Sequence, residues 1–353
     1  MSAAFTYQQL ADRYANFIVP AAKIKVNGMD VLRTHRLVIH EMEISLALHM
    51  AGSVVVKFAH VYDEKSHSFG SGIRQVFPLG TIAEVELGYV SNTQQVFKGY
   101  VEMAGVEMGE SELFVVTLMD VRRLMMASGK KSILHKVSNY SDAFTAVMES
   151  YRPLCRLSVD ATSDGLEEPV PQAENDYEFV EYGLIQNGRA DREFLVCGDT
   201  AYFRKPQKVK APVMTLRYGR ELLSLSVSHC YQDLKIRVLG VDDAEQEIRA
   251  EEKVTANMPL KKLIIPPPVH LVTDPYADTQ SRADTRAQAE AGKVSIYGSI
   301  GHGTTLGLPE IVPGRFVQIE NVDAFVNKKF YVTEVTHTYT DDTFVTQFEI
   351  GGC

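Results

Sequence analysis

The residues with the most evident chemical potential are carboxylates that crowd positions 174 to 193. A glycoside hydrolase, the class that includes cell-wall lysozymes, needs two carboxyl groups roughly 5–10 Å apart across a cleft. The chain has 45 acidic residues, so such pairs arise by chance, and it has no tryptophan to form a sugar-stacking platform. We therefore interpret the stretch as solvated or interface charge. Its members are Glu174, Asp176, Glu178, Glu181, Asp191 and Glu193.

The histidines and serines do not form a catalytic or metal-binding pattern either. His35 and His40 are five positions apart, and His60 and His67 are seven apart, so neither pair fits a zinc motif such as H-E-x-x-H. His337 lies in an alternating segment and is expected to be a half-buried structural residue. No serine lies in a G-x-S-x-G nucleophile elbow. The sequence predicts no cofactor, no metal and no enzymatic activity.

A glycine-rich segment, GSIGHGTTLG at 298–307, resembles a phosphate-binding loop only superficially. It lacks the Gly-Lys-Ser/Thr ending of a P-loop and the G-x-G-x-x-G spacing of a dinucleotide site. The residues after it look like a strand, whereas a phosphate would need the N-terminus of a helix there. We expect a flexible loop between strands.

The four cysteines are widely separated, at positions 155, 197, 230 and 353. They form no C-x-x-C pair, and four thiols in 353 residues are too few for a disulfide framework. They are expected to be reduced and buried as small apolar side chains.

Composition excludes several classes of protein. Hydrophobic residues make up 45% of the chain and charged residues 23%, as in folded soluble proteins. No apolar run approaches the ~18–20 residues of a membrane span, and the N-terminus has no secretory signal pattern. The net charge of −9 argues against general affinity for nucleic acid or anionic membrane.

Hydrophobic periodicity divides the chain into two β-rich ends and a mixed middle. Alternation over 23–126 predicts antiparallel strands. A short amphipathic helix is expected over 5–17, and a second helical segment from Asp176 to Gly188. An alanine-rich helix is expected near 277–291, and the last sixty residues return to strands. The fold class is therefore α+β and mostly β.

Several motifs in this order resemble one known family. The family's F-x-G-x-V … L-x-V-T-x-x-D segment is similar to VFKGYVEMAGV followed by LFVVTLMDVRRLM in this chain. Its central helix is similar to QAENDYEFVEYGLIQNG, and its closing strands are similar to LPEIVPGRFVQI with YVTEVTH. The family is the phage late-control D or contractile-tail baseplate hub group, which includes the head region of type VI secretion VgrG proteins. The resemblance covers about 25–350. The positions that it singles out as signature or interface residues are Phe97, Gly99, Asp120, Asp176, Phe179, Pro313, Gly314, Tyr331 and His337.

This resemblance implies a specific domain organisation. Two tube-like antiparallel β-barrels, at 24–127 and 235–353, would flank an α/β middle region at 128–234. A helical arm would occupy 1–23, and the second barrel would include the linker helix near 277–291.

The resemblance also implies a function. The chain would be a non-enzymatic baseplate hub of a contractile phage tail or related injection system. Its homotrimer would form a pseudo-sixfold ring that adapts the tail tube to the spike, with DNA passing through the lumen. The implied partners are a tail-tube or tube-initiator protein, other baseplate proteins and a separate spike protein, since the chain stops at Cys353. It would assemble in the bacterial cytoplasm and end in the virion tail baseplate. The alternatives are a receptor- or carbohydrate-binding β-protein of the same particle and a cell-wall hydrolase.

Overall fold

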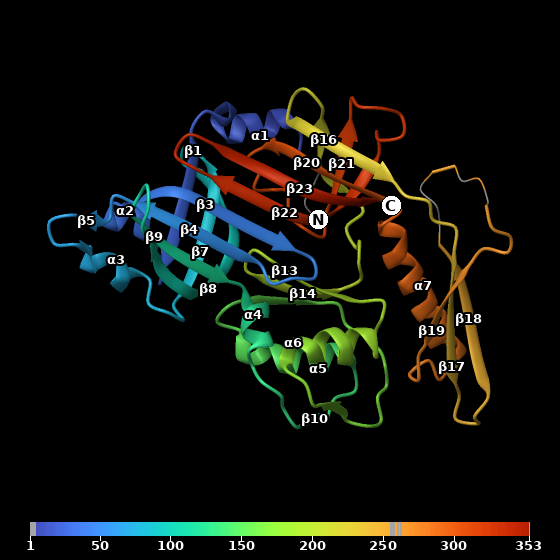
Figure 1. Cartoon of the computed structure of the whole chain (residues 1–353). Coiled ribbons are helices and arrows are strands. Elements are labelled where there is room, and N and C mark those ends of the chain that lie inside the picture. The colour runs from blue at the N-terminus through green and yellow to red at the C-terminus, as the bar shows by residue number, and fades with distance from the viewer. Residues whose placement is uncertain (1–4, 255–257, 260, 262, 353) are drawn as a thin grey trace.

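The protein is built around one large β-sheet, with two smaller units attached to it (Figure 1). The computed structural model describes residues 5–254, 258–259, 261 and 263–352. In this part of the chain the fold is mostly β, as the sequence predicts.

Strands from the N-terminal third form one side of the large sheet. Their order is β3-β4-β9-β8-β7-β1-β2, and every neighbouring pair is antiparallel. Two short helices and a small hairpin extend from this side. The strands are β1 (Pro20–Val26), β2 (Met29–Asp30), β3 (Val38–Ala47), β4 (Ser53–Ala59), β7 (Ile82–Tyr89), β8 (Asn92–Glu107) and β9 (Leu113–Met119). The extension contains α2 (Val31–His35), β5 (Tyr62–Asp63), β6 (Ser68–Phe69) and α3 (Ser71–Val76).

Strands from the C-terminal third, together with two strands that precede residue 230, form the other side. Their order is β16-β20-β23-β22, and β21 pairs with both β22 and β15. The strands are β15 (Pro212–Arg217), β16 (Leu222–His229), β20 (Ser299–Leu306), β21 (Phe316–Glu320), β22 (Lys329–Tyr339) and β23 (Phe344–Gly352).

Strand β22 joins the two sides into a single 13-stranded sheet. One end of it, Lys329–Tyr331, pairs with β21, and the other end, Glu334–Tyr339, pairs with β3. A register shift between Val332 and Glu334 separates the two pairings. The described strands of this sheet thus follow one continuous path that ends at β16 and at β2. The resemblance implied two separate tube-like barrels, and no closed barrel is seen among these strands. The pairing of β22 with β3 joins the two sides.

The middle of the chain forms a compact unit beneath the sheet, drawn in green in Figure 1. Its apolar core includes Phe144, Phe179, Phe194 and Phe203. The elements are α4 (Val121–Met126), β10 (Ile133–His135), α5 (Tyr140–Met148), η2 (Glu149–Tyr151), β11 (Arg156–Val159), β12 (Val170–Gln172), α6 (Asp176–Glu178), the π-helical η3 (Phe179–Gln186), β13 (Glu193–Cys197) and β14 (Thr200–Arg204).

A second small unit, which we call the arm, stands beside the sheet near the C-terminus (Figure 1). It contains β17 (Lys235–Val241), β18 (Glu247–Lys253), β19 (Val269–Thr273) and α7 (Gln280–Ile296). The strands form their own sheet in the order β18-β17-β19, and alanines of α7 pack on it in a separate core. Residues that the sequence assigns to a second barrel are therefore divided between the arm and the large sheet.

The glycine-rich segment is a strand and not a loop. Residues Ser299–Leu306 form β20, which pairs with β16 and β23. A Cβ at Gly303 would lie 2.5 Å from the ring of Phe348, and one at Gly301 would lie 2.3 Å from the carbonyl oxygen of Ser226. The glycines thus allow neighbouring groups to approach β20 closely, which glycine content alone does not reveal.

The N-terminal helix covers the core of the sheet. It is shorter than predicted: α1 spans Tyr7–Arg13 and is followed by the 3-10 turn η1 (Ala15–Phe17). Thr6 and Gln9 form a capping box at its start. Leu10 and Tyr14 are fully buried against the sheet core, and the Tyr14 ring lies 5.6 Å from that of Tyr89.

Two glycine substitutions test the close packing around β20. Gly303→Ala should destabilise the protein by about 1–3 kcal/mol, because the new methyl group overlaps Phe348. Gly292→Ala, in the exposed interior of α7 with nothing within 4 Å, should instead stabilise it by about 0.5–1 kcal/mol. Urea unfolding measures the free energy of unfolding of both variants. Equal changes in the two variants would contradict the close packing at Gly303.

Candidate functional site

The nine signature positions do not converge on one cleft. Phe97, Gly99 and His337 lie in the large sheet, and Asp176 and Phe179 lie in the middle unit. The other four lie where the middle unit meets the sheet. Asp120, Gly314 and Tyr331 belong to two buried polar clusters, and Pro313 is a buried residue directly before Gly314. We call this region the junction. Its signature residues are Asp120, Pro313, Gly314 and Tyr331.

Asp120 organises the first cluster of the junction. It caps the N-terminus of α4, and its Oδ2 accepts hydrogen bonds from the Gly52 backbone nitrogen at 2.7 Å and from Arg122 Nη2 at 2.8 Å. Arg122 is fully buried, and its Nη1 donates to the carbonyls of Ala47 and Leu48 at 2.9 and 3.1 Å. The ion pair therefore fixes the β3–β4 turn to the start of the middle unit.

Glu193 and Arg204 form the second cluster. Arg204 Nε donates to Glu193 Oε1 at 2.8 Å, and Arg204 Nη2 donates to the Gly314 carbonyl at 2.8 Å. The Tyr331 hydroxyl donates to the same carboxylate at 3.4 Å. Gly314 has a φ of 77°, and a Cβ there would lie 2.5 Å from Arg204 and from Leu195. Strands β13 and β14 are thus tied to the turn before β21 and to β22.

Glu181 is a carboxylate beside the junction that has a buried oxygen atom without a hydrogen-bond partner. The residue lies on the π-helix η3, and the oxygen is its Oε1. Burial raises the pKa of Glu181 to about 7, although the positive charges of Arg122 and Lys293 lower it. His49 shares these neighbours, and burial together with Lys293 and Arg122 lowers its pKa. A junction built of buried charges is therefore sensitive to pH.

The signature residues of the middle unit have structural partners. Asp176 is buried and accepts hydrogen bonds from Tyr151 Oη at 2.6 Å, from Gln172 Nε2 at 2.7 Å and from Lys131. The ring of Phe179 stacks on His135 with centroids 5.0 Å apart. These contacts hold the start of η3 against the β10–β12 hairpin.

The signature residues of the sheet are packing positions. Phe97 is buried, and a Cβ at Gly99 would lie 2.2 Å from the Met119 carbonyl oxygen. His337 is fully buried where we expected half-burial, because β22 is covered on this face by the core. Its Nδ1 lies 2.9 Å from Thr346 Oγ1, and burial lowers its pKa to about 3.

The acidic stretch is divided among separate ion pairs. Asp176 pairs with Lys131, Asp191 with Arg189, and Glu193 with Arg204. Among the residues that the structure describes, no group of three His, Cys, Asp or Glu side chains could hold a metal ion. Within the same part of the chain, no helix is long and apolar enough to cross a membrane.

The thiols differ in environment. Burial raises the pKa of both Cys155 and Cys197 to about 11, so neither is an activated nucleophile. Cys230 is exposed, in contrast to our expectation, because it follows the last residue of edge strand β16. The prediction for Cys353 lies outside the described residues.

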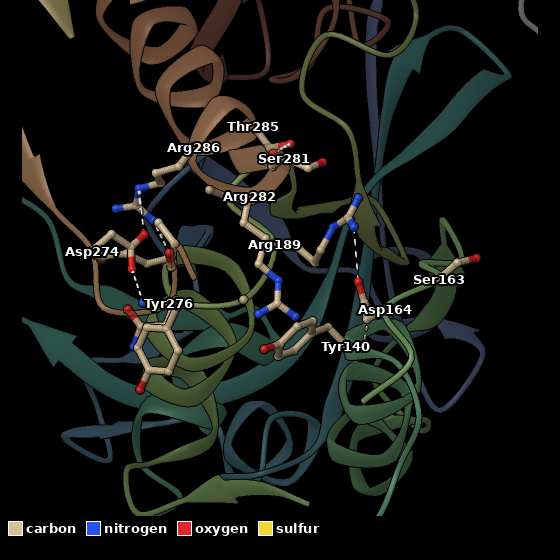
Figure 2. A pocket seen from close by; sticks show the side chains of 15 residues that line it. Tyr140, Ser163, Asp164, Arg189, Asp274, Tyr276, Ser281, Arg282, Thr285 and Arg286 are labelled. Atoms are coloured by element: carbon tan, nitrogen blue, oxygen red, sulfur yellow. Dashed lines mark hydrogen bonds and ion pairs between the residues drawn. The ribbon is translucent and has the colours of Figure 1, made fainter. Parts of the chain in front are cut away.

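A cavity of about 150 Å³ lies where α7 meets the middle unit (Figure 2). Three arginines line it, but each has a carboxylate partner: Arg189 pairs with Asp164 and Asp191, Arg282 with Asp278, and Arg286 with Asp274 and Glu290. The volume is below the ~300 Å³ at which ligand pockets begin. We interpret the cavity as a packing gap at the joint of the arm.

Sequence reasoning missed the partners that make the junction, namely Arg122, Glu193 and Arg204. Arg122 follows Asp120 by two positions, so its sequence context offered a signal: an arginine beside the acidic cap of a helix. Glu193 and Arg204 face each other across the β13–β14 hairpin, where register places them as direct partners. Neither signal shows that the pairs are buried beneath another part of the chain.

Two adjacent arginines test the first cluster. Arg122→Met leaves the buried Asp120 carboxylate without its ion-pair partner and should cost about 3–5 kcal/mol of unfolding free energy. Arg123→Met removes an exposed pair with Glu102 and should cost less than about 1 kcal/mol. Chemical denaturation measures the unfolding free energy of both variants. Similar losses of unfolding free energy would show that the buried Asp120–Arg122 pair matters no more than an exposed one.

The second test concerns the pH dependence caused by Glu181. Its folded-state pKa of about 7 lies above the ordinary glutamate value of 4.5, so the folded state holds the extra proton between these values. Stability should therefore fall by about 2–3 kcal/mol as pH rises from 4.5 through 7. Glu181→Gln should remove this slope in pH-dependent unfolding, and Glu110→Gln on the exposed β8–β9 turn controls for the lost charge. An unchanged slope in Glu181→Gln would contradict the assignment.

Comparison with known structures places the fold among tail proteins. The structure is similar to a tail protein from Neisseria meningitidis, with a TM-score of 0.71 and 11% identity, over 95% of this chain and 97% of that one. It is also similar to the 43 kDa tail protein of prophage MuSo2 from Shewanella oneidensis, with a TM-score of 0.68 and 13% identity, over 93% and 97% of the two chains.

A third similar structure belongs to a secretion system. It is the E. coli c3393 protein, a component of the type VI secretion system, with a TM-score of 0.58 and 11% identity, over 94% of this chain and 77% of that one. At these identities the likeness concerns the fold. No curated protein matches the sequence.

One family model matches the sequence, over residues 18–341, and its description is the Alg8 N-terminal domain. That description differs from the late-control D and baseplate hub group that the motifs resemble. The chain thus belongs to the Alg8 N-terminal domain family and has the fold of phage tail proteins and of a type VI secretion component.

Proposed function

We propose that the chain is a non-enzymatic hub subunit of the baseplate of a contractile phage tail or related injection system. The observation that carries this proposal is the likeness to the Neisseria tail protein over nearly the whole of both chains. Fold likeness alone leaves function open, and the arrangement of strands and charges in this chain supplies the further support.

The two sides of the large sheet each contribute six long strands. One set is β1, β3, β4, β7, β8 and β9, and the other is β15, β16, β20, β21, β22 and β23. Two such sets per chain support a ring in which three copies present six similar faces. In such a ring each set would form one of the two tube-like barrels that the sequence motifs imply, although the two sets are joined in one sheet within the chain. The resulting pseudo-sixfold ring would adapt a sixfold tail tube to a threefold spike.

The polar groups of the chain support a structural role. The buried carboxylates Asp120, Asp176 and Glu193 each pair with a cation and hold two parts of the chain together. A hydrolase would need two carboxyl groups facing a substrate cleft. We therefore propose no catalytic residues, no cofactor and no metal. Among the signature positions, Asp120, Gly314 and Tyr331 act as joints between units of the subunit.

The proposed partners follow from this role. They are two further copies of the chain, a spike protein, a tail-tube or tube-initiator protein and other baseplate proteins. The subunit would assemble in the bacterial cytoplasm and reside in the virion tail baseplate, with DNA passing through the lumen of the ring.

Solution mass tests this function. Light scattering behind a sizing column should give about 118 kDa, three times the 39.3 kDa of one chain. Co-expression with a tail-tube protein and a spike protein from the same particle should yield one complex with three copies of the chain. A stable dimer, lysis of peptidoglycan, or binding of the isolated chain to host cells would contradict the hub and favour the hydrolase or the receptor-binding protein.

A further inference from the structure

The two ends of the large sheet differ in how well they are protected against pairing with another strand. At one end, β2 has only two residues, and β1 begins with Pro20 and contains Lys23 and Lys25. Short strands, proline and lysine are the usual means of protecting a sheet edge. At the other end, β16 has eight residues, LLSLSVSH, without any Asp, Glu, Lys or Arg. We call its unpaired side the body edge.

The sheet of the arm shows the same contrast. Its outer strand β18 carries five charged residues among seven, EIRAEEK. The opposite outer strand β19 is VHLVT, which contains none of these charges and exposes 40% of Val269 and 54% of Leu271. Just before it, Leu263, Ile264 and Ile265 are exposed by 70%, 58% and 81%. We call the unpaired side of β19 the arm edge.

The remaining long edges are covered or protected. The outer side of β15 receives the N-terminal segment, since the Phe5 nitrogen donates to the Val213 carbonyl at 2.8 Å. The part of β8 that extends beyond β7 has a bulge between Val101 and Met103 and carries Glu102 and Glu107. Among the described strands of the large sheet and the arm, the body edge and the arm edge are thus both long and neutral, and neither has a strand partner.

We propose that the body edge of one copy pairs with the arm edge of the next copy, so that the arm fastens neighbouring subunits head to tail. Each copy has one edge of each kind, and a heterologous contact of this sort closes into a ring when its rotation is right. This inference rests on the proposed ring and names the surfaces that would form it. The partner is therefore a second copy of this chain.

Two features of the chain favour this occupant. First, both edges lack Asp, Glu, Lys and Arg, so neither brings an unpaired charge into the contact, while the charged β18 edge would oppose such pairing. Second, the chain already uses this kind of joint: β22 and β3, more than 280 positions apart, pair antiparallel along Glu334–Tyr339 and Met42–Ala47. A between-copy joint of β16 and β19 would repeat the same backbone interaction.

The test places a charge on each edge in turn. Leu271→Lys and Ser226→Lys should each reduce the solution mass from about 118 kDa to the 39.3 kDa of one chain. Val322→Lys, on the exposed turn between β21 and β22, is the matched control and should leave the mass unchanged. Circular dichroism and thermal unfolding confirm that each variant is folded. A trimer in both edge variants would overturn the proposal.

A double variant tests whether the two edges contact each other. Leu271→Glu combined with Ser226→Lys should restore the trimer at low salt and lose it at high salt, because opposite charges then face each other in every contact. If both single variants dissociate and the double variant does not recover, the two edges serve separate partners and their pairing is overturned.

Hydrogen exchange of the unmodified protein provides a readout that needs no substitution. Amides in Leu223–His229 and Val269–Thr273 should exchange at least tenfold more slowly at concentrations where the trimer forms than in the monomer. A trimer without this protection would overturn the inference while leaving the hub function intact. An isolated chain that remains monomeric at every concentration would overturn the inference as well, whereas the hub function would still be decided by the complex with tube and spike.

Discussion

The architecture depends on the pairing of strand β22 with three other strands. It pairs with β23 along one side, and on the other side with β21 at its start and β3 at its end. The register shift after Val332 allows this strand to change partner without losing its ladder to β23. If β22 could not contact β3, the N-terminal and C-terminal strands would have separate sheets. The single 13-stranded sheet and its shared core exist because of this one joint.

The middle unit is attached to that sheet by apolar contacts and by buried charge pairs. Tyr100 of β8 belongs to the core of the middle unit, and Leu195 of β13 packs with Leu48, Phe316 and Tyr331. Asp120 with Arg122, and Glu193 with Arg204, each connect the middle unit to turns or strands of the sheet. Buried ion pairs contribute little net stability, but a single unpaired member is costly, so they favour one docking geometry over others. The arm is attached more simply, through Arg286 to the Gln186 carbonyl and through Ile296 to the sheet side.

The sheet edges differ in their charge: β18 carries five charged residues among seven, whereas β16 and β19 carry no Asp, Glu, Lys or Arg. A charged edge strand such as β18 is protected against pairing, because its lysine and glutamate side chains oppose the addition of another strand. Neutral strands such as β16 and β19 lack that protection. In a protein with a net charge of −9, two long neutral edges are a local exception that overall composition conceals.

The sequence by itself determined many of the local elements and the predominance of β-structure. Alternating apolar residues predicted β4, β9 and β23, and the signature motifs predicted a tail-protein fold. Tertiary structure decided everything that depends on distant partners. Gly303 lies in a strand because Phe348 occupies the space of its missing side chain, and Arg122 is buried because Ala47 and Leu48 offer it carbonyl oxygens. Local propensity acts between residues a few positions apart, whereas burial and strand partnership arise only when the whole chain has folded.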